Sequence, residues 1–268
     1  GTNNMAAAAA KPNVLILFAD DWGWGDLGAN WEATKGLTPH MDSLAESGMR
    51  FTDFHAGASV CTPSRASLLT GRLGLRTGVT HNFGPGSEYG LPEAEITIAT
   101  LLKQQTPEYH TAMIGKWHLG TTPGFSPTYR GFDEWFGLPY SDDMGCTDRV
   151  WPNLPLEPTC DKDPPATRAS TPVEAPPPEE LGDGGHKGWP LPLYRSTTNC
   201  SGQTSGDCNK DIVEQPARLE TLSQRYAAYA HDVVGRSVQS RRPFFLYVAF
   251  AHMHVPQFCA AGYANKTG

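Results

Sequence analysis

The segment Cys61–Arg72 (C-T-P-S-R-A-S-L-L-T-G-R) joins a reactive side chain to the start of an expected helix. Pro63 suits the first helical turn, and Gly71 can end the helix in the left-handed conformation. Cys61 would then lie just before a helix N-terminus, where free N–H groups and the helix dipole favour negative charge. Arg65 lies one turn further on and could turn back towards the same place. This arrangement suits chemistry on a tetrahedral oxyanion such as sulfate or phosphate, although a buried structural cysteine explains a lone Cys more simply.

Two adjacent carboxylates, Asp20 and Asp21, follow the apolar run Val14–Ala19. Such a run predicts a strand buried on both faces of a parallel sheet, and ligands of these sheets gather at the carboxyl ends of the strands. Adjacent carboxylates repel each other unless a cation or hydrogen bonds offset the repulsion, and hard oxygen ligands favour Ca²⁺ or Mg²⁺. On spacing alone, two turn carboxylates that cap Gly25 or Asp26 are the simpler interpretation.

Two pairs of basic residues follow other predicted strands. Lys116 and His118 come after the short strand 111–114, and residues two apart in an extended segment face the same way, so their side chains should point together. A surface lysine beside a hydrogen-bonded core histidine is the alternative. His252 and His254 follow the last apolar run with the same spacing. A transition-metal site is not favoured there, because no third nitrogen or sulfur ligand stands nearby.

Together these segments resemble the type I, formylglycine-dependent sulfatase family, and most of all the animal arylsulfatases of the A and G types. Cys61–Arg72 matches the signature C-x-P-S-R-x-x-x-L-x-G-R at seven fixed positions. Residues 13–21 match the N-[IV]-[IL]-x-[IL]-x-A-D-D opening, and residues 115–120 (G-K-W-H-L-G) match the second signature. Residues 254–256 match a His-x-Pro of the family, so the resemblance runs over residues 12–256.

The resemblance implies a modified nucleophile and a metal ion. Cys61 would be oxidised to formylglycine (3-oxoalanine) by the formylglycine-generating enzyme. A thiolate that attacked a sulfate ester would leave a thiosulfate with no easy release, whereas a hydrated aldehyde carries two hydroxyls on one carbon. The resemblance further implies that Asp20, Asp21 and the oxygens derived from Cys61 bind Ca²⁺, in preference to Mg²⁺.

The resemblance also gives roles to side chains around the nucleophile. Arg65 and Lys116 would steady the formylglycine, and Lys116 would also contact the sulfate. His118 would take a proton when sulfate leaves, and His254 would donate to a sulfate oxygen. Ser141 matches a substrate-side serine of relatives similar to arylsulfatase A. The neighbouring pair Asp142-Asp143, which a second metal ion could use, is interpreted as loop charge.

The function implied is that of a sulfuric ester hydrolase acting on a sulfated small molecule, glycan or glycolipid. One alternative is a phosphonate or phosphodiester hydrolase of the same superfamily, which can share the C-x-P-S-R core. The other is a truncated, inactive sulfatase that acts only as a binding module. The rim loops that would select a substrate carry no motif that names it.

The fold class expected is α/β, with a mostly parallel, alkaline-phosphatase-like sheet sandwiched between helices and incomplete at the C-terminus. Residues 1–11 form an expected disordered lead-in, and residues 12–268 an N-terminal catalytic domain. A proline-rich insertion over about 151–209 would lie at the rim of the cleft, because it is too long and too rich in proline for core structure. The family's further Asp-Asn metal-ligand pair, second active-site lysine and small C-terminal domain are expected beyond residue 268.

Hydrophobic periodicity and punctuation predict the elements between these motifs. Expected helices cover 40–47, 98–105 and 215–240, and expected strands cover 49–55, 111–114 and 244–250.

Composition narrows the partners. The 268 residues carry a net charge of −7, which argues against a nucleic-acid or polybasic membrane role, and no apolar run reaches the ~20 residues of a membrane helix. Asn199 and Asn265 fit the N-glycosylation pattern. Four of the remaining cysteines, Cys146, Cys160, Cys200 and Cys208, lie in or beside a loop-rich region, as disulfides of secreted proteins often do. A lysosomal or secreted location is therefore expected, although no signal peptide is visible.

Overall fold

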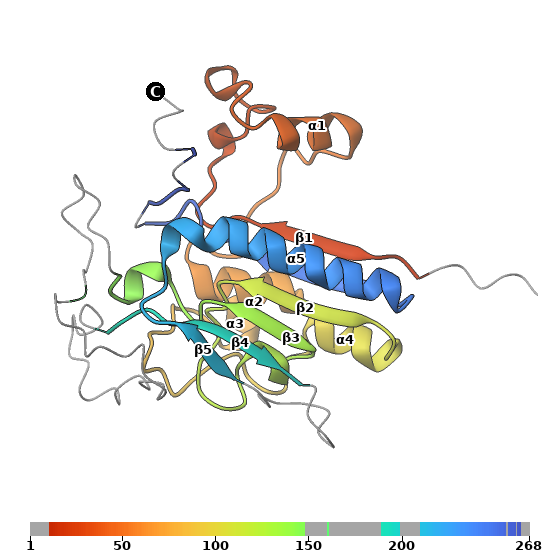
Figure 1. The fold of residues 1–268 in the computed structure, drawn as a ribbon, viewed down its shortest axis with the longest axis vertical. Coiled ribbons are helices and arrows are strands. Elements are labelled where there is room, and N and C mark those ends of the chain that lie inside the picture. Colours follow the sequence, from red (N-terminus) through yellow and green to blue (C-terminus); the bar gives the residue numbers. More distant parts are fainter. Residues whose placement is uncertain are drawn as a thin grey trace, which may run out of the picture.

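The structure is a computed structural model in which the strands form one sheet with helices on both of its faces (Figure 1). It describes residues 11–147, 160, 189–198, 210–255, 257–260 and 262–263. Several sequence predictions lie outside these residues: most of the lead-in, most of the proline-rich segment, and Asn199, Cys200, Cys208, Pro256 and Asn265. No helix of the described part is long and apolar enough to cross a membrane.

Six strands form the sheet in the order β1-β6-β2-β3-β4-β5. β1, β6, β2 and β3 run parallel, whereas β4 pairs antiparallel with β3, and β5 antiparallel with β4. The predicted mostly parallel α/β class is therefore confirmed, with an antiparallel edge that the sequence did not predict. The strands are β1 (Val14–Phe18), β2 (His110–Gly115), β3 (Glu134–Gly137), β4 (Leu193–Thr197), β5 (Asp211–Glu214) and β6 (Phe244–Ala249).

Two of the helices have clear local causes for their ends. Gly71, with φ of +68°, ends α2 in the left-handed conformation. Thr97 caps α4, because its side chain accepts a hydrogen bond from the backbone N–H of Thr100 at 3.1 Å. The helices are α1 (Pro39–Ser47), α2 (Cys61–Thr70), α3 (Gly74–Thr77), α4 (Ile98–Gln105) and α5 (Leu222–Gln239), with short 3₁₀ turns η1 (Trp24–Asp26), η2 (Glu32–Thr34), η3 (Pro127–Tyr129), η4 (Asp142–Met144) and η6 (Leu219–Thr221).

Alternating side chains of the central strands divide the core into two halves. Leu246 of β6 belongs to one cluster, together with Tyr226 of α5. The preceding residue, Phe245, belongs to the other cluster, together with Leu69 of α2 and Ala99 of α4. The sheet thus lies between α5 on one face and α2 and α4 on the other, as the sequence predicted (Figure 1).

The edge strand β1 is buried on one face only, so the prediction of burial on both faces is wrong. Val14, Ile16 and Phe18 pack against the cluster that contains α2 and α4. Leu15 and Leu17 point to the α5 side of the sheet and are 52% and 58% exposed. The cause is the position of α5, which packs over β2 and β6 and leaves the end of the sheet open on that side.

The predicted strand 49–55 does not form. These residues make bends and irregular segments, and Phe51 and Phe54 are 65% and 74% exposed. A strand needs a neighbour for its backbone hydrogen bonds, and no strand of the described sheet lies beside this segment. The predicted helices 40–47 and 98–105 are confirmed as α1 and α4.

Two predictions near the C-terminal half need correction. The predicted helix 215–240 begins only at Leu222, because residues 211–214 pair with β4 as β5, and Pro216 lacks the N–H that a helix interior needs. The predicted irregular insertion 151–209 contains β4, which pairs with β3. Composition pointed to a loop, and tertiary pairing overrode it locally.

Cysteine pairing agrees in part with the sequence expectation. Cys146 and Cys160 form a disulfide, as expected for cysteines of the loop-rich region. Among the described cysteines, Cys61 and Cys259 are free.

Candidate functional site

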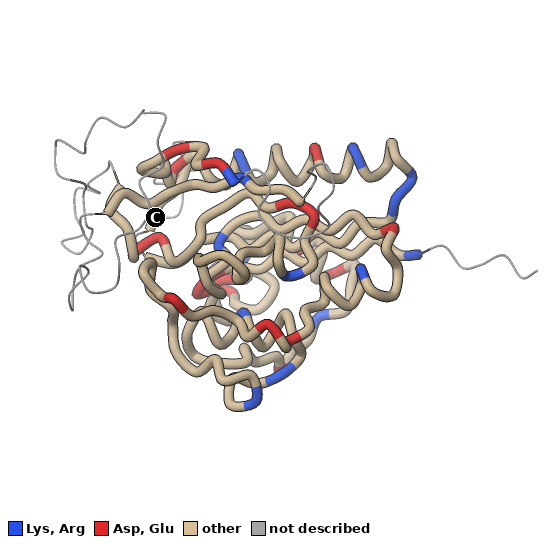
Figure 2. Tube along the Cα trace, turned by 90° about the horizontal axis from the view of Figure 1, so that it is seen from below, with Lys and Arg blue, Asp and Glu red and all other residues tan. Residues whose placement is uncertain are grey.

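Most charged residues are dispersed along the described chain, with both signs intermingled (Figure 2). A few are buried instead: Asp20, Arg65, Lys116 and Asp142 are at most 5% exposed. Asp20 follows β1, Lys116 follows β2, and α2 carries Cys61 and Arg65. Because ligands of open parallel sheets bind at the carboxyl ends of the strands, this edge is the candidate site.

Asp20 is the centre of the cluster. Its Oδ2 accepts a hydrogen bond from Lys116 Nζ at 2.5 Å, and its Oδ1 lies 3.2 Å from Arg65 Nη2. Burial alone would raise the pKa of Asp20, but the charges of Arg65 and Lys116 outweigh it and lower that pKa below its ordinary value. Asp20 is therefore an ionised carboxylate held by two buried cations.

The ammonium group of Lys116 joins the other members of the site. Its Nζ lies 3.4 Å from Cys61 Sγ and donates to Ser141 Oγ at 2.9 Å, besides its bond to Asp20. Lys116 has no exposed surface, so its three donors are directed by these partners alone. One side chain thus contacts the predicted nucleophile, a predicted metal ligand and a predicted substrate-side serine.

Cys61 is the first residue of α2, whereas the sequence predicted that it lies just before the helix. It is partly exposed. Its Sγ lies 3.7 Å from Asp20 Oδ1. Arg65 turns back from the next helical turn, as predicted: its Nη1 donates to Lys116 O at 2.6 Å and its guanidinium lies 5.4 Å from the ring centre of Phe18. The backbone of Lys116 and the side chain of Arg65 therefore hold each other in place.

His118 lies near the cluster for a different reason from the one predicted. Its φ of +57° breaks the extended run, so strict alternation with Lys116 does not apply. Its Nε2 donates to Phe83 O at 2.9 Å, and its Nδ1 has no hydrogen-bond partner among the described residues. Burial, followed by the charges of Lys116 and Arg65, lowers the pKa of His118 well below its ordinary value. The ring is therefore neutral, with a lone pair on Nδ1.

The two histidines after β6 do not face alike, contrary to the alternation argument. His252 bonds to Ser223 Oγ at 2.7 Å and packs on Phe258 with ring centres 4.3 Å apart; burial lowers its pKa to about 4. His254 instead faces the cluster, with Nε2 3.7 Å from Asp21 Oδ2. The sequence preference for His254 over His252 thus agrees with where the two side chains lie.

The carboxylate oxygens here fit a hard cation, whereas Cys61 offers sulfur and His254 nitrogen. Asp20, Cys61 and His254 each bring a possible ligand atom within 4.8 Å of the others. Asp21 stands beside this group with an exposed carboxylate and a positive φ of 56°. The ionised state of Asp20 supplies the charged oxygen that Ca²⁺ prefers, and an exposed Asp21 side chain can turn towards the same position.

Asp142 is the residue that the sequence analysis misjudged. It is fully buried, so its interpretation as loop charge is wrong. Neither of its carboxylate oxygens has a hydrogen-bond partner among the described residues, and burial raises its pKa to about 7. The available signal was its position directly after Ser141, in the segment that the resemblance had already placed on the substrate side.

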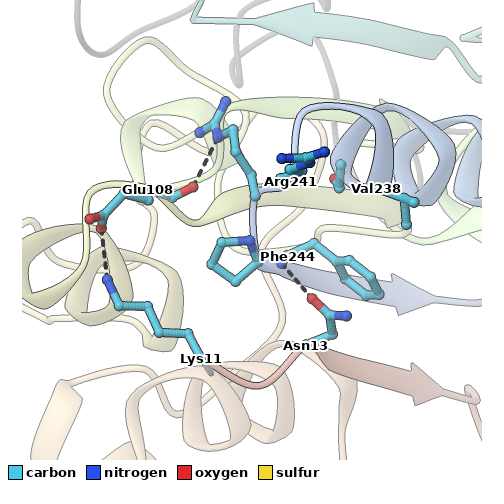
Figure 3. Close-up of a pocket in the computed structure, with 9 residues that line it drawn as sticks. Lys11, Asn13, Glu108, Val238, Arg241 and Phe244 are labelled. Atoms are coloured by element: carbon cyan, nitrogen blue, oxygen red, sulfur yellow. Dashed lines mark hydrogen bonds and ion pairs between the residues drawn. The ribbon is translucent and has the colours of Figure 1, made fainter. Parts of the chain in front are cut away.

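A pocket of about 480 Å³ lies at the opposite, amino-terminal edge of the strands (Figure 3). Its contacts join polar groups to one another: Lys11 Nζ lies 3.1 Å from Glu108 Oε2, and Arg242 Nε donates to Glu108 O at 2.9 Å. Asn13 Oδ1 accepts from Phe244 N at 3.1 Å. Ser237 lines the pocket and bonds His110, which pairs with Glu134, but the polar atoms of these groups are paired with one another, so the carboxyl edge is the better site.

The mostly parallel sheet between helices, with this cluster at its carboxyl edge, defines an α/β protein of the alkaline-phosphatase-like class. The crystal structure of the PsFucS1 sulfatase from Pseudoalteromonas sp. matches with a TM-score of 0.70 at 26% identity, covering 94% of this chain and 46% of that chain. A family model described as Sulfatase matches residues 12–268. The chain belongs to the sulfatase family.

Two similar relatives within the family are named arylsulfatases. Arylsulfatase G from Mus musculus is 50% identical over 248 residues, which cover 92% of this chain and 42% of that protein. Arylsulfatase A from Homo sapiens is 40% identical over 267 residues, covering 98% of this chain and 45% of that protein. The chain thus spans less than half the length of these relatives.

Proposed function

We propose that this chain forms the N-terminal catalytic domain of a sulfuric ester hydrolase of the arylsulfatase type. The observation that carries the proposal is the buried ammonium of Lys116, whose contacts join Cys61, Asp20 and Ser141. A cation held among a nucleophile, an ionised carboxylate and a buried hydroxyl suits an anionic ester more than a neutral substrate. Membership of the sulfatase family supports the same chemistry.

Residue 61 is the proposed nucleophile after conversion of Cys61 to formylglycine by the formylglycine-generating enzyme. A hydrated aldehyde there supplies two hydroxyls on one carbon, one to attack sulfur and the other to lose its proton so that sulfate leaves as the carbonyl re-forms. The partial exposure of Cys61 leaves room for a substrate, and its place at the start of α2 puts the attack at the positive end of the helix dipole.

Asp20 and Asp21, with the oxygens of the modified residue 61, are the proposed ligands of Ca²⁺, in preference to Mg²⁺. The buried position of Asp20 favours a fixed carboxylate, while the exposed Asp21 can adjust to the irregular coordination that Ca²⁺ accepts more readily than Mg²⁺. When bound, such an ion offsets the negative charge of the sulfate group.

Of the remaining side chains, some are proposed to position the reacting groups and others to transfer protons. Arg65 and Lys116 hold residue 61 and place positive charge where negative charge develops at the sulfate oxygens. His118 is the proposed proton acceptor, because its neutral ring keeps Nδ1 free while Nε2 is fixed on Phe83 O. His254 is proposed to donate to a sulfate oxygen, and Ser141 to contact the substrate beside Lys116.

The proposed substrate is a sulfated small molecule, a sulfated glycan or a glycolipid. The relatives are named arylsulfatases, which supports hydrolysis of an aryl sulfate as the assay reaction. A lysosomal or secreted location is proposed with it, supported by the Cys146–Cys160 disulfide, which suits an oxidising compartment. N-glycosylation at Asn199 and Asn265 would follow from the same route.

The test is to produce the full-length protein together with the formylglycine-generating enzyme and compare hydrolysis of an aryl sulfate with that of the matching aryl phosphodiester. We expect the sulfate ester to be preferred in kcat/KM. A preference for the phosphodiester would assign the site to a phosphonate or phosphodiester hydrolase. Tight binding of inorganic sulfate without turnover of either ester would indicate a binding module.

A further inference from the structure

The Asp142 carboxylate is buried without the partners that such a group normally has. It has no exposed surface, and neither oxygen accepts a hydrogen bond from any described residue. An unpaired buried carboxylate lowers the stability of a fold, so its presence calls for a role other than packing. Asp142 opens the short turn η4 directly after Ser141, at the candidate site.

His254 is the basic residue with which Asp142 can pair. Lys116 also acts on Asp142 through its charge, but its donors already meet Asp20, Cys61 and Ser141. The Oδ1 atom of Asp142 lies 3.6 Å from His254 Nδ1, with the imidazole 11% exposed. His254 is thus the neighbour whose ring Asp142 can orient.

The two nitrogens of His254 have different surroundings. Nδ1 faces two acceptors, Asp142 Oδ1 at 3.6 Å and the carbonyl oxygen of Val255 at 2.5 Å. Both acceptors require a proton on Nδ1, so they favour one orientation of the ring. Nε2 points to the other side, 3.7 Å from Asp21 Oδ2, among the proposed metal ligands. Tyr226 and Asp143 are the other titratable groups that interact with Asp142 through charge.

Resting on the proposed function, we propose that Asp142 is a positioning residue that holds the His254 imidazole with Nδ1 towards itself and Nε2 towards the sulfate ester. A ring free to turn would meet the substrate in two orientations, only one of which presents Nε2–H to a sulfate oxygen. The buried Asp142 carboxylate thus lowers the stability of the fold, but it orients the His254 ring towards the reacting group.

The experiment is a double-mutant cycle in the full-length, formylglycine-containing protein with an aryl sulfate. Asp142→Asn keeps the shape and removes the charge, and we expect kcat/KM to fall about tenfold or more. In a His254→Gln background the same change should lower kcat/KM less than about twofold, because Asp142 acts through the ring. The control is Asp211→Asn, the same change at an exposed residue of β5, with an effect within about twofold.

Two readouts separate this role from a structural one. The thermal midpoint of Asp142→Asn should not fall, because the change removes an unpaired buried charge, whereas loss of a structural residue lowers stability and activity together. The ¹⁵N resonances of His254, assigned by their loss in His254→Gln, should move in Asp142→Asn and stay in place in Asp211→Asn. Should the asparagine variant fail to fold, Asp142→Ser tests the same resonances.

The outcomes distinguish the two proposals. A wild-type protein inactive on sulfate esters would contradict the proposed function, and the His254 resonances would still test the role of Asp142. A wild type that hydrolyses the ester, with equal losses from Asp142→Asn in both backgrounds or with unmoved His254 resonances, would overturn the positioning role alone.

Discussion

Two clusters of buried charge lie at opposite ends of β2, and they are satisfied to different degrees. His110 is the first residue of the strand and Lys116 directly follows its last, which places them about 20 Å apart by the rise of a strand. Around His110 the buried polar atoms have hydrogen-bond partners, whereas around Lys116 several buried polar atoms have none among the described residues.

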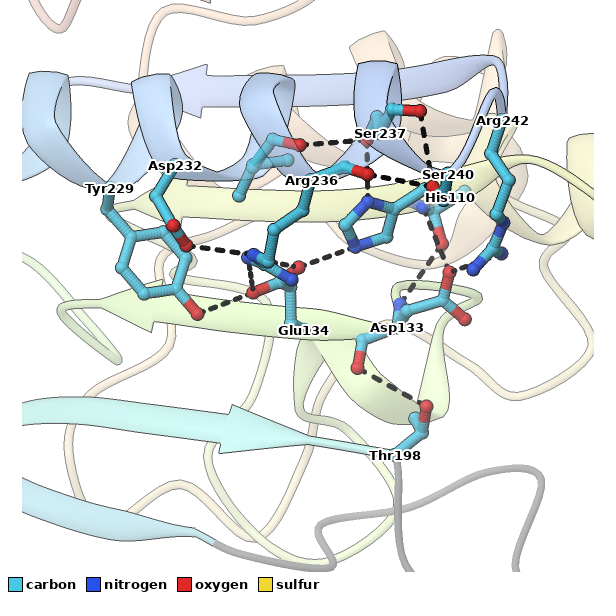
Figure 4. Close-up of polar contacts among 12 residues, drawn as sticks. His110, Asp133, Glu134, Thr198, Tyr229, Asp232, Arg236, Ser237, Ser240 and Arg242 are labelled. Carbon is cyan, nitrogen blue, oxygen red and sulfur yellow. Dashed lines mark hydrogen bonds and ion pairs between the residues drawn. The ribbon is translucent and has the colours of Figure 1, made fainter.

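The cluster at the amino end centres on Glu134, the first residue of β3 (Figure 4). Its Oε1 lies 2.5 Å from His110 Nε2, its Oε2 accepts from Tyr229 OH at 2.6 Å, and Arg236 Nη2 contacts both oxygens at 2.9 and 3.0 Å. The other nitrogen of His110 bonds to Ser237 Oγ at 2.7 Å. Both oxygens of the carboxylate and both nitrogens of the imidazole are therefore paired.

The cluster at the carboxyl end keeps unpaired atoms. Arg65 Nε, His118 Nδ1 and both oxygens of Asp142 are buried without hydrogen-bond partners among the described residues. Native proteins leave few such atoms, and each one needs an explanation, of which a ligand that completes the network is one. The difference indicates that α5 is attached to the sheet by the Glu134 cluster, while the Asp20 cluster is arranged for a ligand.

The largest effect is expected from the nucleophile. Cys61→Ala in the full-length protein should lower aryl sulfate turnover at least about 10⁴-fold, because the covalent route is lost. Cys61→Ser retains one hydroxyl, which can accept sulfate but cannot re-form a carbonyl to expel it. Intact-mass spectrometry should therefore find a trapped sulfate ester in the serine variant. Turnover that survives Cys61→Ala would place the nucleophile elsewhere.

The next largest effects are expected from the proposed metal ligands, and substitutions of Asp20 and Asp21 should differ in their effect on stability. Asp21→Asn should lower activity about 10- to 100-fold and raise the Ca²⁺ concentration needed, with an unchanged thermal midpoint, because its side chain is 63% exposed. Asp20→Asn should lose activity and also about 3–5 kcal/mol of stability, because Arg65 and Lys116 are left as unpaired buried cations. Calcium titration and thermal melts measure the two effects; full activity of both variants in a chelator would refute the metal assignment.

The Glu134 cluster should show the opposite pattern. Glu134→Gln removes the charge that His110, Tyr229 and Arg236 surround, so we expect about 3 kcal/mol less stability and a thermal midpoint lower by roughly 5–10 °C. The kcat of the folded protein should not change, because the cluster lies at the other end of β2. A fall in kcat with an unchanged thermal midpoint would contradict the assignment of stability to the Glu134 cluster and activity to the Asp20 cluster.

The smallest effect is a dependence on pH. Although burial acts to raise it, hydrogen bonds from His110, Arg236 and Tyr229 lower the pKa of Glu134 from 4.5 to about 2. A depressed folded-state pKa stabilises the protein above the unfolded value, and this contribution, on the order of 3 kcal/mol, is lost as pH falls from about 4.5 towards 2. The difference in denaturation free energy between wild type and Glu134→Gln should shrink over that interval. A constant difference would contradict the lowered pKa.

Long apolar runs and capping residues correctly predicted the elements that depend mainly on local sequence. The strand β6 and the helices α2 and α4 follow from continuous or periodic apolar residues with clear stops. The strands β4 and β5 could not be predicted, because their pairing with β3 depends on contacts distant in sequence, inside a stretch whose prolines favour a loop. The exposed face of β1 was missed because an apolar run does not say which neighbours cover it.

The family resemblance, rather than spacing alone, identified the side chains that the structure brings together: Asp20, Cys61, Arg65, Lys116, Ser141 and His254. The only sign of the burial of Asp142 was its position directly after Ser141, because adjacent acidic residues in a loop are usually solvated. The left-handed backbone of His118 was equally invisible, since a non-glycine residue with positive φ is rare. Roles for these side chains stay predictions until the experiments above are done.

The central claim is that the cluster around Lys116 is arranged for an oxygen nucleophile at position 61. The most direct measurement is peptide mass spectrometry on the active, full-length protein produced with the formylglycine-generating enzyme. We predict that the peptide carrying Cys61 is lighter than the thiol form by the difference between a thiol-bearing carbon and an aldehyde, and that the modified fraction tracks aryl sulfate turnover. An active protein in which every copy retains the unmodified thiol would contradict the account.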